Sequence, residues 1–285
     1  MNKLTVKTLS DVPAETIHSA FTDAFSDYEV ELEMTLEKFQ EMIKTRDLSP
    51  NYSLGCFDGN RMIGFILIGV RIINGKKCAY DGGTGTVKDF RRKGLGEKLL
   101  RECISFLKEK QFSHFILEVL ENNLPAINLY TKHGFRKTRR LECFEMPKEN
   151  LRKTSTAKLP FDPRFSNIKN LQLTDYLLFE PTWQNNLTSV RNQPGNYRFS
   201  SVLQNKKTIG IGCIHKNTGS IPLLGVLSNW KNKGLEKEII SELARYTSAK
   251  KIVFLNVEEK NYLGDKLREI GFQNHVNQFE MMLEL

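Results

Sequence analysis

One stretch of this chain has residue types that suit phosphate binding. Residues 91–96 read Arg-Arg-Lys-Gly-Leu-Gly, between a Gly-interrupted strand pattern and apolar residues at helical spacing. A first helical turn leaves N–H groups without intrahelical acceptors, and glycine lets a ligand approach the backbone. The candidate phosphate or pyrophosphate ligands are Arg91, Arg92, Lys93, Gly94, Leu95, Gly96 and Glu97. A solvated basic turn that only starts a helix fits the same residues.

The elements around this stretch alternate between strands and helices. Residues 79–87 and 115–120 read as strands, and helical patterns follow each of them, over 94–110 and 126–133. Asn123 stands at a helix N-cap position, and Gly134 stands where an αL residue ends a helix. Two further helices and two hairpin strands precede these elements, over 13–25, 35–45, 52–57 and 62–72. This order predicts a mixed α/β sheet.

Composition describes a globular protein outside a membrane. The chain has 285 residues, 40% hydrophobic and 26% charged, which allows two ordinary domains. The longest apolar run, residues 62–70, is far shorter than the ~20 residues of a membrane span. Residues 1–7 lack the apolar segment of a signal peptide. We therefore expect a cytoplasmic protein with no membrane partner.

Cysteine and histidine patterns give no sign of a metal site. The five cysteines are scattered with no C-x-x-C pair, and the five histidines show no ligand spacing. The net charge of +9 lies mostly in the second half, where Lys and Arg exceed Asp and Glu by 20 to 13 after residue 147. These charges are scattered without interleaved aromatic residues, so a nucleic-acid partner is not expected.

Two motifs resemble those of the GNAT superfamily of acyl-CoA-dependent N-acetyltransferases. The first is the Arg/Gln-x-x-Gly-x-Gly/Ala phosphate loop, which Arg91, Gly94 and Gly96 match. The second is Leu-x-Val, Asn, Ala-x-x-Leu-Tyr and Gly-Phe, matched by residues 117–119, Asn123, Ala126, 129–130 and 134–135. Each motif alone is common, so their combination in this order carries the resemblance over residues 1–147. It implies a mostly antiparallel sheet with one splayed parallel strand pair and flanking helices.

The second half of the chain repeats the first. Lys233-Gly234-Leu235 matches Lys93-Gly94-Leu95, and Gly271-Phe272 matches Gly134-Phe135. The repeat predicts a catalytic domain over 1–147, a proline-punctuated linker over 148–170 and a second GNAT-like domain over 171–285.

The second copy lacks important residues of the first. Lys231 replaces Arg91, Glu236 replaces Gly96, and Leu267 falls where Tyr130 falls. A carboxylate at position 236 would repel phosphate. We expect that this domain has lost acyl-CoA binding and completes the substrate cleft or forms a homodimer interface.

The resemblance implies acetyl-CoA as cofactor, with coenzyme A as product and no metal. Residues 84–87, which include Thr84, would hold the pantetheine arm of the cofactor opposite residues 117–119. The N–H of either Thr86 or Val87 would face the thioester oxygen. Tyr130 matches the family's general acid near the sulfur, although a tyrosine packed on the sheet fits the pattern too. Asn123 would contact the cofactor, cap its helix, or do both.

The amine acceptor and the proton acceptor are less determined. Glu118 and Asp81 are both candidates for the base, which takes a proton directly or through water. Within the acidic stretch 23–33, Asp27, Tyr28 and Glu31 are candidate contacts of a cationic acceptor such as a polyamine, an aminoglycoside or a lysine side chain. The same residues are also compatible with an exposed acidic loop that binds no acceptor.

We therefore expect an N-acetyltransferase that transfers acetyl directly to a primary amine in a ternary complex. Two other functions fit the sequence. One is an acyl-CoA-binding or sensing protein without turnover. The other is an aminoacyl transferase that uses tRNA, as some tandem GNAT-like ligases do, for which the basic second half would be suited.

Overall fold

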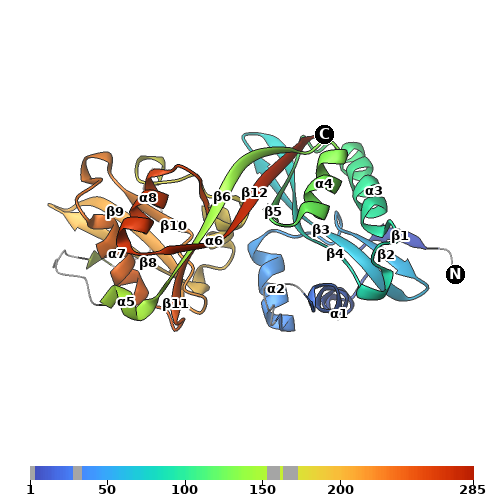
Figure 1. Cartoon of the computed structure of the whole chain (residues 1–285), viewed down its shortest axis with the longest axis horizontal. Coiled ribbons are helices and arrows are strands. Elements are labelled where there is room, and N and C mark those ends of the chain that lie inside the picture. The colour runs from blue at the N-terminus through green and yellow to red at the C-terminus, as the bar shows by residue number, and fades with distance from the viewer. Residues whose placement is uncertain (1–3, 28–33, 153–160, 163–172) are drawn as a thin grey trace. The chain divides into compact units, whose positions relative to one another are not determined.

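The computed structural model describes residues 4–27, 34–152, 161–162 and 173–285. The chain forms two compact units, one of Met1–Thr138 with Glu280–Leu285 and one of Arg139–Phe279 (Figure 1). These limits differ from the predicted domain limits of 147 and 171, because two strands each contribute residues to both units. They are β6 (Arg136–Pro147) and β12 (Gln273–Glu284).

The first unit contains the helices and strands that the sequence pattern predicted. Thr35 caps the second helix by accepting the Lys38 N–H, and Gly134 has a φ of 90° after the fourth helix. The elements are β1 (Thr5–Thr8), α1 (Ala14–Phe25), α2 (Leu36–Thr45), β2 (Leu54–Asp58), β3 (Arg61–Ile73), β4 (Lys76–Thr86), η1 (Lys88–Phe90), α3 (Leu95–Glu109), β5 (His114–Leu120) and α4 (Leu124–Lys132).

The central sheet of this unit splays where the sequence predicted. Its strands lie in the order β1-β2-β3-β4-β5, antiparallel except for the last pair. β4 and β5 are parallel and pair only from Cys78–Tyr80 to His114–Ile116, after which they separate. The mixed α/β sheet with a splayed parallel pair is confirmed.

A β-bulge lies at the point where the two strands separate. Ile68 of β3 pairs with Asp81, while the preceding Leu67 pairs with Gly83, so Gly82 is the additional residue of β4. A Cβ at Gly82 would lie 2.3 Å from Leu48 Cδ2, so any larger residue would require the Leu48 side chain to move. The bulge turns the side chains beyond it and sets the geometry of the cleft.

Helices cover both faces of this sheet. Figure 1 shows α1 and α2 on one side and α3 and α4 on the other. A Cβ at Gly64 would meet Leu95 and Leu99 of α3, whereas a Cβ at Gly85 would meet Ala24 of α1. Residues of β4 and β5 therefore face either α1 and α2 or α3 and α4 according to strand alternation.

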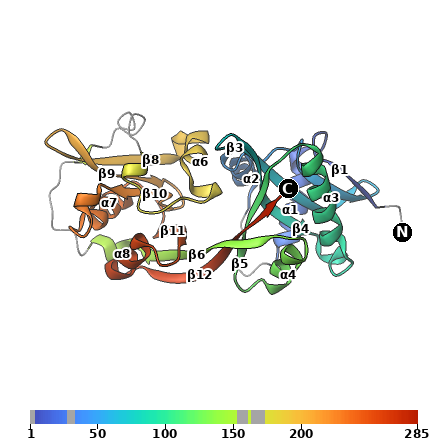
Figure 2. The ribbon, with the colours of Figure 1, turned by 90° about the horizontal axis from the view of Figure 1, so that it is seen from above.

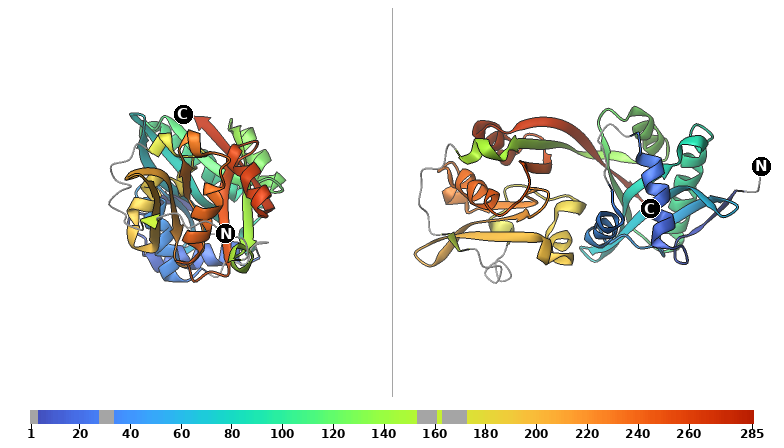
Figure 3. Two further views of the ribbon diagram at one scale, coloured as in Figure 1. Left: turned by 90° about the vertical axis from the view of Figure 1, so that its left-hand side faces the viewer. Right: turned by 90° about the horizontal axis from the view of Figure 1, so that it is seen from below.

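The end of the chain completes the sheet of the first unit. β12 lies between β5 and β6 in the strand order, and Figure 3 shows β6 and β12 side by side. The Leu285 N–H donates to the Ser113 carbonyl at 3.1 Å, and Thr138 Oγ1 donates to Glu280 Oε1 at 2.7 Å. Residues 280–285 are thus part of the first unit, although Glu280 is 142 positions after Thr138 in the sequence.

The second unit repeats the architecture. Figure 2 shows β8, β9 and β10 side by side with α7 against them. Its elements are α5 (Lys148–Arg152), β7 (Phe161–Asp162), η3 (Leu173–Asp175), η4 (Trp183–Asn185), α6 (Leu187–Asn192), η5 (Pro194–Asn196), β8 (Tyr197–Gln204), β9 (Lys207–His215), β10 (Leu223–Val226), η6 (Ser228–Trp230), α7 (Leu235–Ala244), β11 (Lys251–Glu258) and α8 (Tyr262–Ile270).

The predicted linker over 148–170 is wrong at its start. Residues 148–152 form helix α5, and Leu151 is buried in the core of the second unit. Phe161–Asp162 form strand β7, which pairs with β8. Residues 153–160 and 163–170 lie outside the described residues.

The internal repeat holds at the level of backbone angles. Val87 and Leu227 share φ −58° and ψ 146°, and each donates its N–H to an isoleucine of the third strand of its unit. Arg92 and Asn232 have φ of 60° and 62°, and Gly94 and Gly234 have φ of 74° and 80°. The two strand-to-helix loops therefore have one backbone conformation.

Candidate active site

The loop before α3 leaves open space above the first helical turn. Gly94 adopts a left-handed conformation, and the first helical hydrogen bond runs from the Lys98 N–H to the Gly94 carbonyl. The N–H groups of residues 95–97 precede that bond and have no intrahelical acceptor. A Cβ at Gly94 or at Gly96 would meet no atom within 4 Å. A pyrophosphate therefore fits against the backbone here.

The side chains of this loop have different surroundings. Arg92 is exposed, and Lys93 Nζ donates to the Asp89 carbonyl at 2.7 Å. Glu97 binds Lys132 of α4 at 2.6 Å, and this hydrogen bond is the main reason why the pKa of Glu97 is lowered. Glu97 thereby connects the start of α3 to the end of α4, the helix that carries Tyr130.

Arg91 and Asp27 form an ion pair, which the sequence did not predict. Arg91 Nη1 and Nη2 donate to the two Asp27 oxygens at 2.7 and 2.8 Å, and Nη2 also donates to the Ala24 carbonyl. Arg91 Nε donates to the Thr86 carbonyl at 3.2 Å. The hydrogen bond from Arg91 is the largest cause that lowers the pKa of Asp27 to about 2.

This arrangement joins a predicted cofactor ligand to a predicted acceptor ligand. The Arg91 guanidinium fastens the end of α1 to the end of β4, so its side chain is used within the protein. The backbone of its loop still faces the open space. The other two predicted acceptor ligands, Tyr28 and Glu31, lie outside the described residues.

Strand alternation decides which amide points into the cleft between β4 and β5. The Val87 N–H donates to the Ile63 carbonyl of β3 at 3.0 Å, so it points away from the cleft. Successive amides of a strand point to opposite sides, so the N–H groups of Thr86 and Thr84 point toward β5. Of the two amides that the sequence left open, Thr86 is the one that faces the cleft.

Asp81 and Tyr130 meet on the face that α3 and α4 cover. The Tyr130 hydroxyl donates to Asp81 Oδ2 at 3.2 Å. The same carboxylate accepts the Thr84 hydroxyl at 2.7 Å and the Gly83 N–H at 3.0 Å. Only 8% of Asp81 is exposed, and burial raises the pKa of its carboxyl group.

Glu118 lies on the opposite face of the sheet. Phe115, Leu117 and Val119 are buried, with Phe115 against Phe135 on the α4 side, so Glu118 points toward the face of α1 and α2. It accepts a hydrogen bond from the hydroxyl of Tyr80, a fully buried residue of β4. Burial, followed by the charge of Glu118, raises the pKa of Tyr80 well above its usual value.

The two candidate bases therefore have different neighbours. Asp81 contacts Tyr130, the candidate acid, whereas Glu118 lies with Tyr80 on the face that α1 and α2 cover. Asn123 caps α4 by accepting the Ala126 N–H at 3.3 Å, as predicted.

Sequence reasoning missed Arg46. This residue follows α2, and its Nη1 donates to the carbonyl of the bulged Gly82 at 3.2 Å. No spacing in the sequence connects a residue after α2 with a glycine 36 positions later. Tyr80 was missed as well, although it directly precedes Asp81.

The residues that the structure describes lack a metal-binding cluster and a membrane-spanning helix. They contain no group of three or more His, Cys, Asp or Glu placed to hold a metal ion. None of their helices has the length and apolar character needed to cross a membrane.

Sequence comparison finds a family model that matches most of the first unit. Residues 14–135 match the family described as Acetyltransferase (GNAT) family. A local match of 48 residues, 42% identical, connects the chain to streptothricin acetyltransferase A of Bacillus subtilis. That match spans 17% of this chain and 28% of the length of the relative.

Solved structures share the fold over nearly the whole chain. A tandem GNAT protein from the clavulanic acid biosynthesis pathway has a TM-score of 0.72 at 13% identity and covers 99% of this chain and 98% of its own. A putative acetyltransferase from Pyrococcus horikoshii has a TM-score of 0.69 at 15% identity, and the match covers 100% of this chain and 90% of that protein. A GCN5-related N-acetyltransferase from Sphaerobacter thermophilus has a TM-score of 0.70 at 12% identity, and the match covers 99% of this chain and 95% of that protein. Residues 14–135 thus match the acetyltransferase (GNAT) family, and the whole chain has the fold of a tandem GNAT protein.

Proposed function

We propose that the first unit transfers an acetyl group from acetyl-CoA to a primary amine, by direct attack in a ternary complex. The observation that carries the proposal is the hydrogen bond between Tyr130 and Asp81, at the splay of β4 and β5 and on the strand that ends at Thr86. The phosphate loop with its open first turn lies at the end of the same strand. A binding loop, an amide donor and a titratable pair are the parts that acyl transfer needs.

Acetyl-CoA would supply the acetyl group as a thioester and leave as coenzyme A. The N–H groups of residues 92–97, with the cations Arg92 and Lys93, would bind its pyrophosphate. Thr84 and Thr86 would hold the pantetheine arm through strand-like hydrogen bonds. Asn123 would add a contact from the N-terminus of α4. The Arg91 side chain would act indirectly, by holding the loop against α1.

Glu118 would accept the proton of the attacking amine. An amine with a pKa near ~10 is mostly protonated at neutral pH, so it must lose a proton before it attacks. Glu118 lies on the face of α1 and α2 and accepts a hydrogen bond from Tyr80, which fixes the position of its carboxylate. Asp81 is excluded from this task because it is buried beside Tyr130 on the other face.

Thr86 and Tyr130 would act on the thioester. The Thr86 N–H would stabilise the negative charge that develops on the thioester oxygen. The Tyr130 hydroxyl would give its proton to the leaving sulfur, and Asp81 would hold that hydroxyl in place. Each step uses a group that the splay of β4 and β5 brings to the cleft.

The acceptor would be a cationic amine. Glu118 would face the acceptor from the side of α1 and α2, and the local relative is a streptothricin acetyltransferase. A screen of coenzyme A release should therefore contain streptothricin, polyamines, aminoglycosides and lysine peptides. A homodimer, which the sequence left open, stays a prediction.

The turnover screen tests the proposal directly. We expect coenzyme A release that depends on at least one amine, and a Glu118→Gln variant that binds acetyl-CoA normally but turns over about a hundredfold more slowly. Binding of acetyl-CoA without release by any amine would favour a sensing protein instead. Tight, salt-sensitive tRNA binding without acetyl-CoA binding would favour the aminoacyl transferase.

A further inference from the structure

The second unit contains the same cofactor groove in backbone outline. Val226 precedes Leu227 as Thr86 precedes Val87, and Asn232 has the left-handed conformation of Arg92. The Leu227 N–H donates to the Ile209 carbonyl of β9 at 3.0 Å, so the Val226 N–H points away from β9, as the Thr86 N–H points away from β3. Each polar backbone group that would bind coenzyme A in the first unit therefore has a counterpart in the second.

A segment of the second unit takes the place beside β10. The Val226 N–H donates to the Tyr176 carbonyl at 2.8 Å, and the Leu178 N–H donates to the Leu224 carbonyl at 3.3 Å. Leu177 forms an antiparallel bridge with Gly225, whose other side pairs with Ile211 of β9. The strand edge that corresponds to the pantetheine slot is thus hydrogen-bonded to the chain itself.

The approach of this segment requires the glycine. A Cβ at Gly225 would lie 2.5 Å from the Tyr176 carbonyl oxygen and 2.6 Å from its carbonyl carbon. The corresponding Gly85 of the first unit has side chains, Phe65 and Ala24, at that position. The close approach of Tyr176 therefore explains why position 225 is a glycine, without any ligand.

A tyrosine occupies the phosphate end of the same groove. The Asn232 N–H donates to the Tyr262 hydroxyl at 2.8 Å, and that hydroxyl donates to Glu236 Oε1 at 2.7 Å. Lys231 Nζ lies 5.1 Å from the centre of the Tyr262 ring. Burial and the bond to Glu236 raise the pKa of Tyr262 to about 12, so the hydroxyl keeps its proton.

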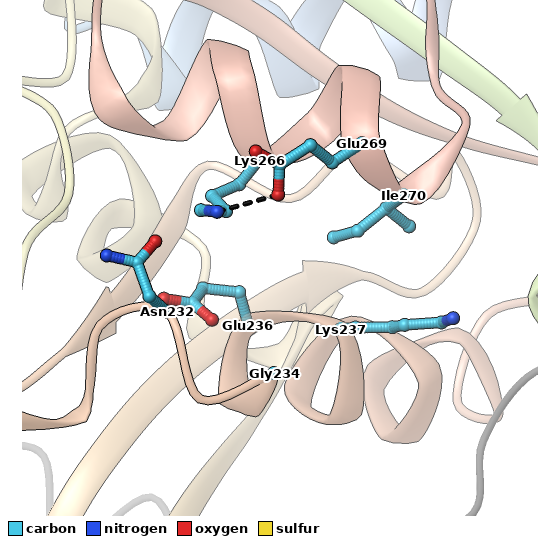
Figure 4. Close-up of a pocket in the computed structure, with 7 residues that line it drawn as sticks. All are labelled: Asn232, Gly234, Glu236, Lys237, Lys266, Glu269 and Ile270. Atoms are coloured by element: carbon cyan, nitrogen blue, oxygen red, sulfur yellow. Dashed lines mark hydrogen bonds and ion pairs between the residues drawn. The ribbon is translucent and has the colours of Figure 1, made fainter.

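The carboxylate of Glu236 lies where the first unit has open space. Glu236 replaces Gly96, and only 2% of it is exposed. Figure 4 shows Glu236 on the floor of a pocket of about 220 Å³ between α7 and α8, with the Lys266–Glu269 pair on its opposite wall. A phosphate placed at the start of α7 would meet this buried negative charge.

Building on the proposed function of the first unit, we infer that the second unit carries an internal substitute for coenzyme A. Residues 176–178 take the hydrogen bonds of the pantetheine arm, and the Tyr262 hydroxyl takes that of a phosphate oxygen. The backbone N–H groups of Val226 and Asn232 in this groove therefore have acceptors within the chain. One chain then binds one acyl-CoA, in the first unit. The second unit keeps the fold because its own residues supply the contacts that a cofactor would make.

Calorimetric titration of the full chain with acetyl-CoA tests the stoichiometry. We expect one equivalent for the native protein and none for Gly96→Glu, which copies the second unit into the first. Lys108→Glu is the matched control, since it places a carboxylate at the exposed far end of α3, and it should still bind one equivalent. Two equivalents for the native protein, or one remaining in Gly96→Glu, would overturn the inference.

A second variant separates the two parts of the substitute. Glu236→Gly combined with Tyr262→Phe removes the carboxylate and the hydroxyl but leaves residues 176–178 in place. We expect this variant to bind one equivalent still, because the pantetheine slot stays filled. A second equivalent would show that the segment does not close the groove.

Amide hydrogen exchange reports on the groove without any ligand. The Val226 amide should be protected in the free protein and unchanged by acetyl-CoA, whereas the Thr86 amide should exchange fast and slow by about tenfold or more when acetyl-CoA binds. Fast exchange at Val226, or a change there on titration, would contradict the internal substitute. If acetyl-CoA bound nowhere, the proposed function would fail, while protection at Val226 would still support this inference.

Discussion

In the proposed reaction, the leaving sulfur would need the proton that Tyr130 donates to Asp81 in this structure. A hydroxyl has one proton, so Tyr130 cannot donate to Asp81 and to a sulfur at the same time. Rotation about the bond to its oxygen changes the acceptor, while the ring stays packed against Phe135. Asp81 would therefore position the hydroxyl at rest, and the developing thiolate of the proposed reaction would compete with it for the proton.

Replacing Tyr130 with phenylalanine separates these roles. We expect Tyr130→Phe to lower kcat by about a hundredfold or more, because the acid is lost, with little change in acetyl-CoA affinity. Steady-state kinetics beside calorimetric titration measure the two quantities. Equal losses of kcat and affinity, or no loss, would remove Tyr130 from the role of acid.

Sequence reasoning named Asp81, Glu118, Thr86 and Val87 as candidates but could not show which face of the sheet each one occupies. Asp81 and Glu118 were equal candidates because both are carboxylates in predicted strands of similar pattern. The bulge at Gly82 and the alternation of β5 place them on opposite faces, and strand alternation also selects Thr86 over Val87. Pairing geometry of this kind depends on partners that the local sequence does not show.

At the scale of elements, Arg91 connects α1 with the end of β4 and the phosphate loop. The pair with Asp27 is bidentate and lies at the surface, with side chains 37% and 46% exposed. Such a pair contributes modestly to stability but fixes orientation. A change at Asp27 should therefore affect the loop before it affects the fold.

The pair gives a pH dependence with a definite sign. The pKa of Asp27 is about 2 in the folded protein, below its ordinary value of 3.8, so the pair stabilises the fold above pH about 4 and loses that contribution as the pH falls to 2. Asp27→Asn should lower the melting temperature at pH 7. The difference in melting temperature between the variant and the native protein should become smaller near pH 2. A gap that widens in acid would contradict this assignment.

The bulge makes a prediction about packing. Gly82→Ala should destabilise the first unit by about 1–3 kcal/mol, because the new Cβ would lie 2.3 Å from Leu48 Cδ2. Leu48→Ala removes that atom, so the double variant should lose less stability than the two single losses together. Denaturant titration measures all three variants, and additive losses would exclude the clash as the cause.

At the scale of the whole molecule, each unit is completed by residues that the sequence assigns to the other half. Met281 of β12 is fully buried and belongs to the first unit. The sequence repeat placed it in the second domain, since it aligns with Met146. Only strand order, with β12 next to β5, shows that the first unit depends on the end of the chain.

Met281→Ala should therefore destabilise the first unit, by about 2–5 kcal/mol for a buried methionine. Amide exchange should become faster in β5 and stay unchanged in β9. Glu284→Ala, an exposed position on the same strand, is the control and should change stability by less than about 0.5 kcal/mol. Faster exchange confined to β9 would contradict the assignment.

The sequence by itself determined the family motifs, the order of elements, the repeat and the loss of Gly96 in the second copy. Glycines, caps and apolar spacing act over a few residues, so they can be read along the chain. Tertiary structure alone decided the Arg91–Asp27 pair, the faces of Asp81 and Glu118, the exchange of chain ends between units and the segment beside β10. These features join residues tens of positions apart, and only the closed sheet brings their hydrogen-bonding groups into contact.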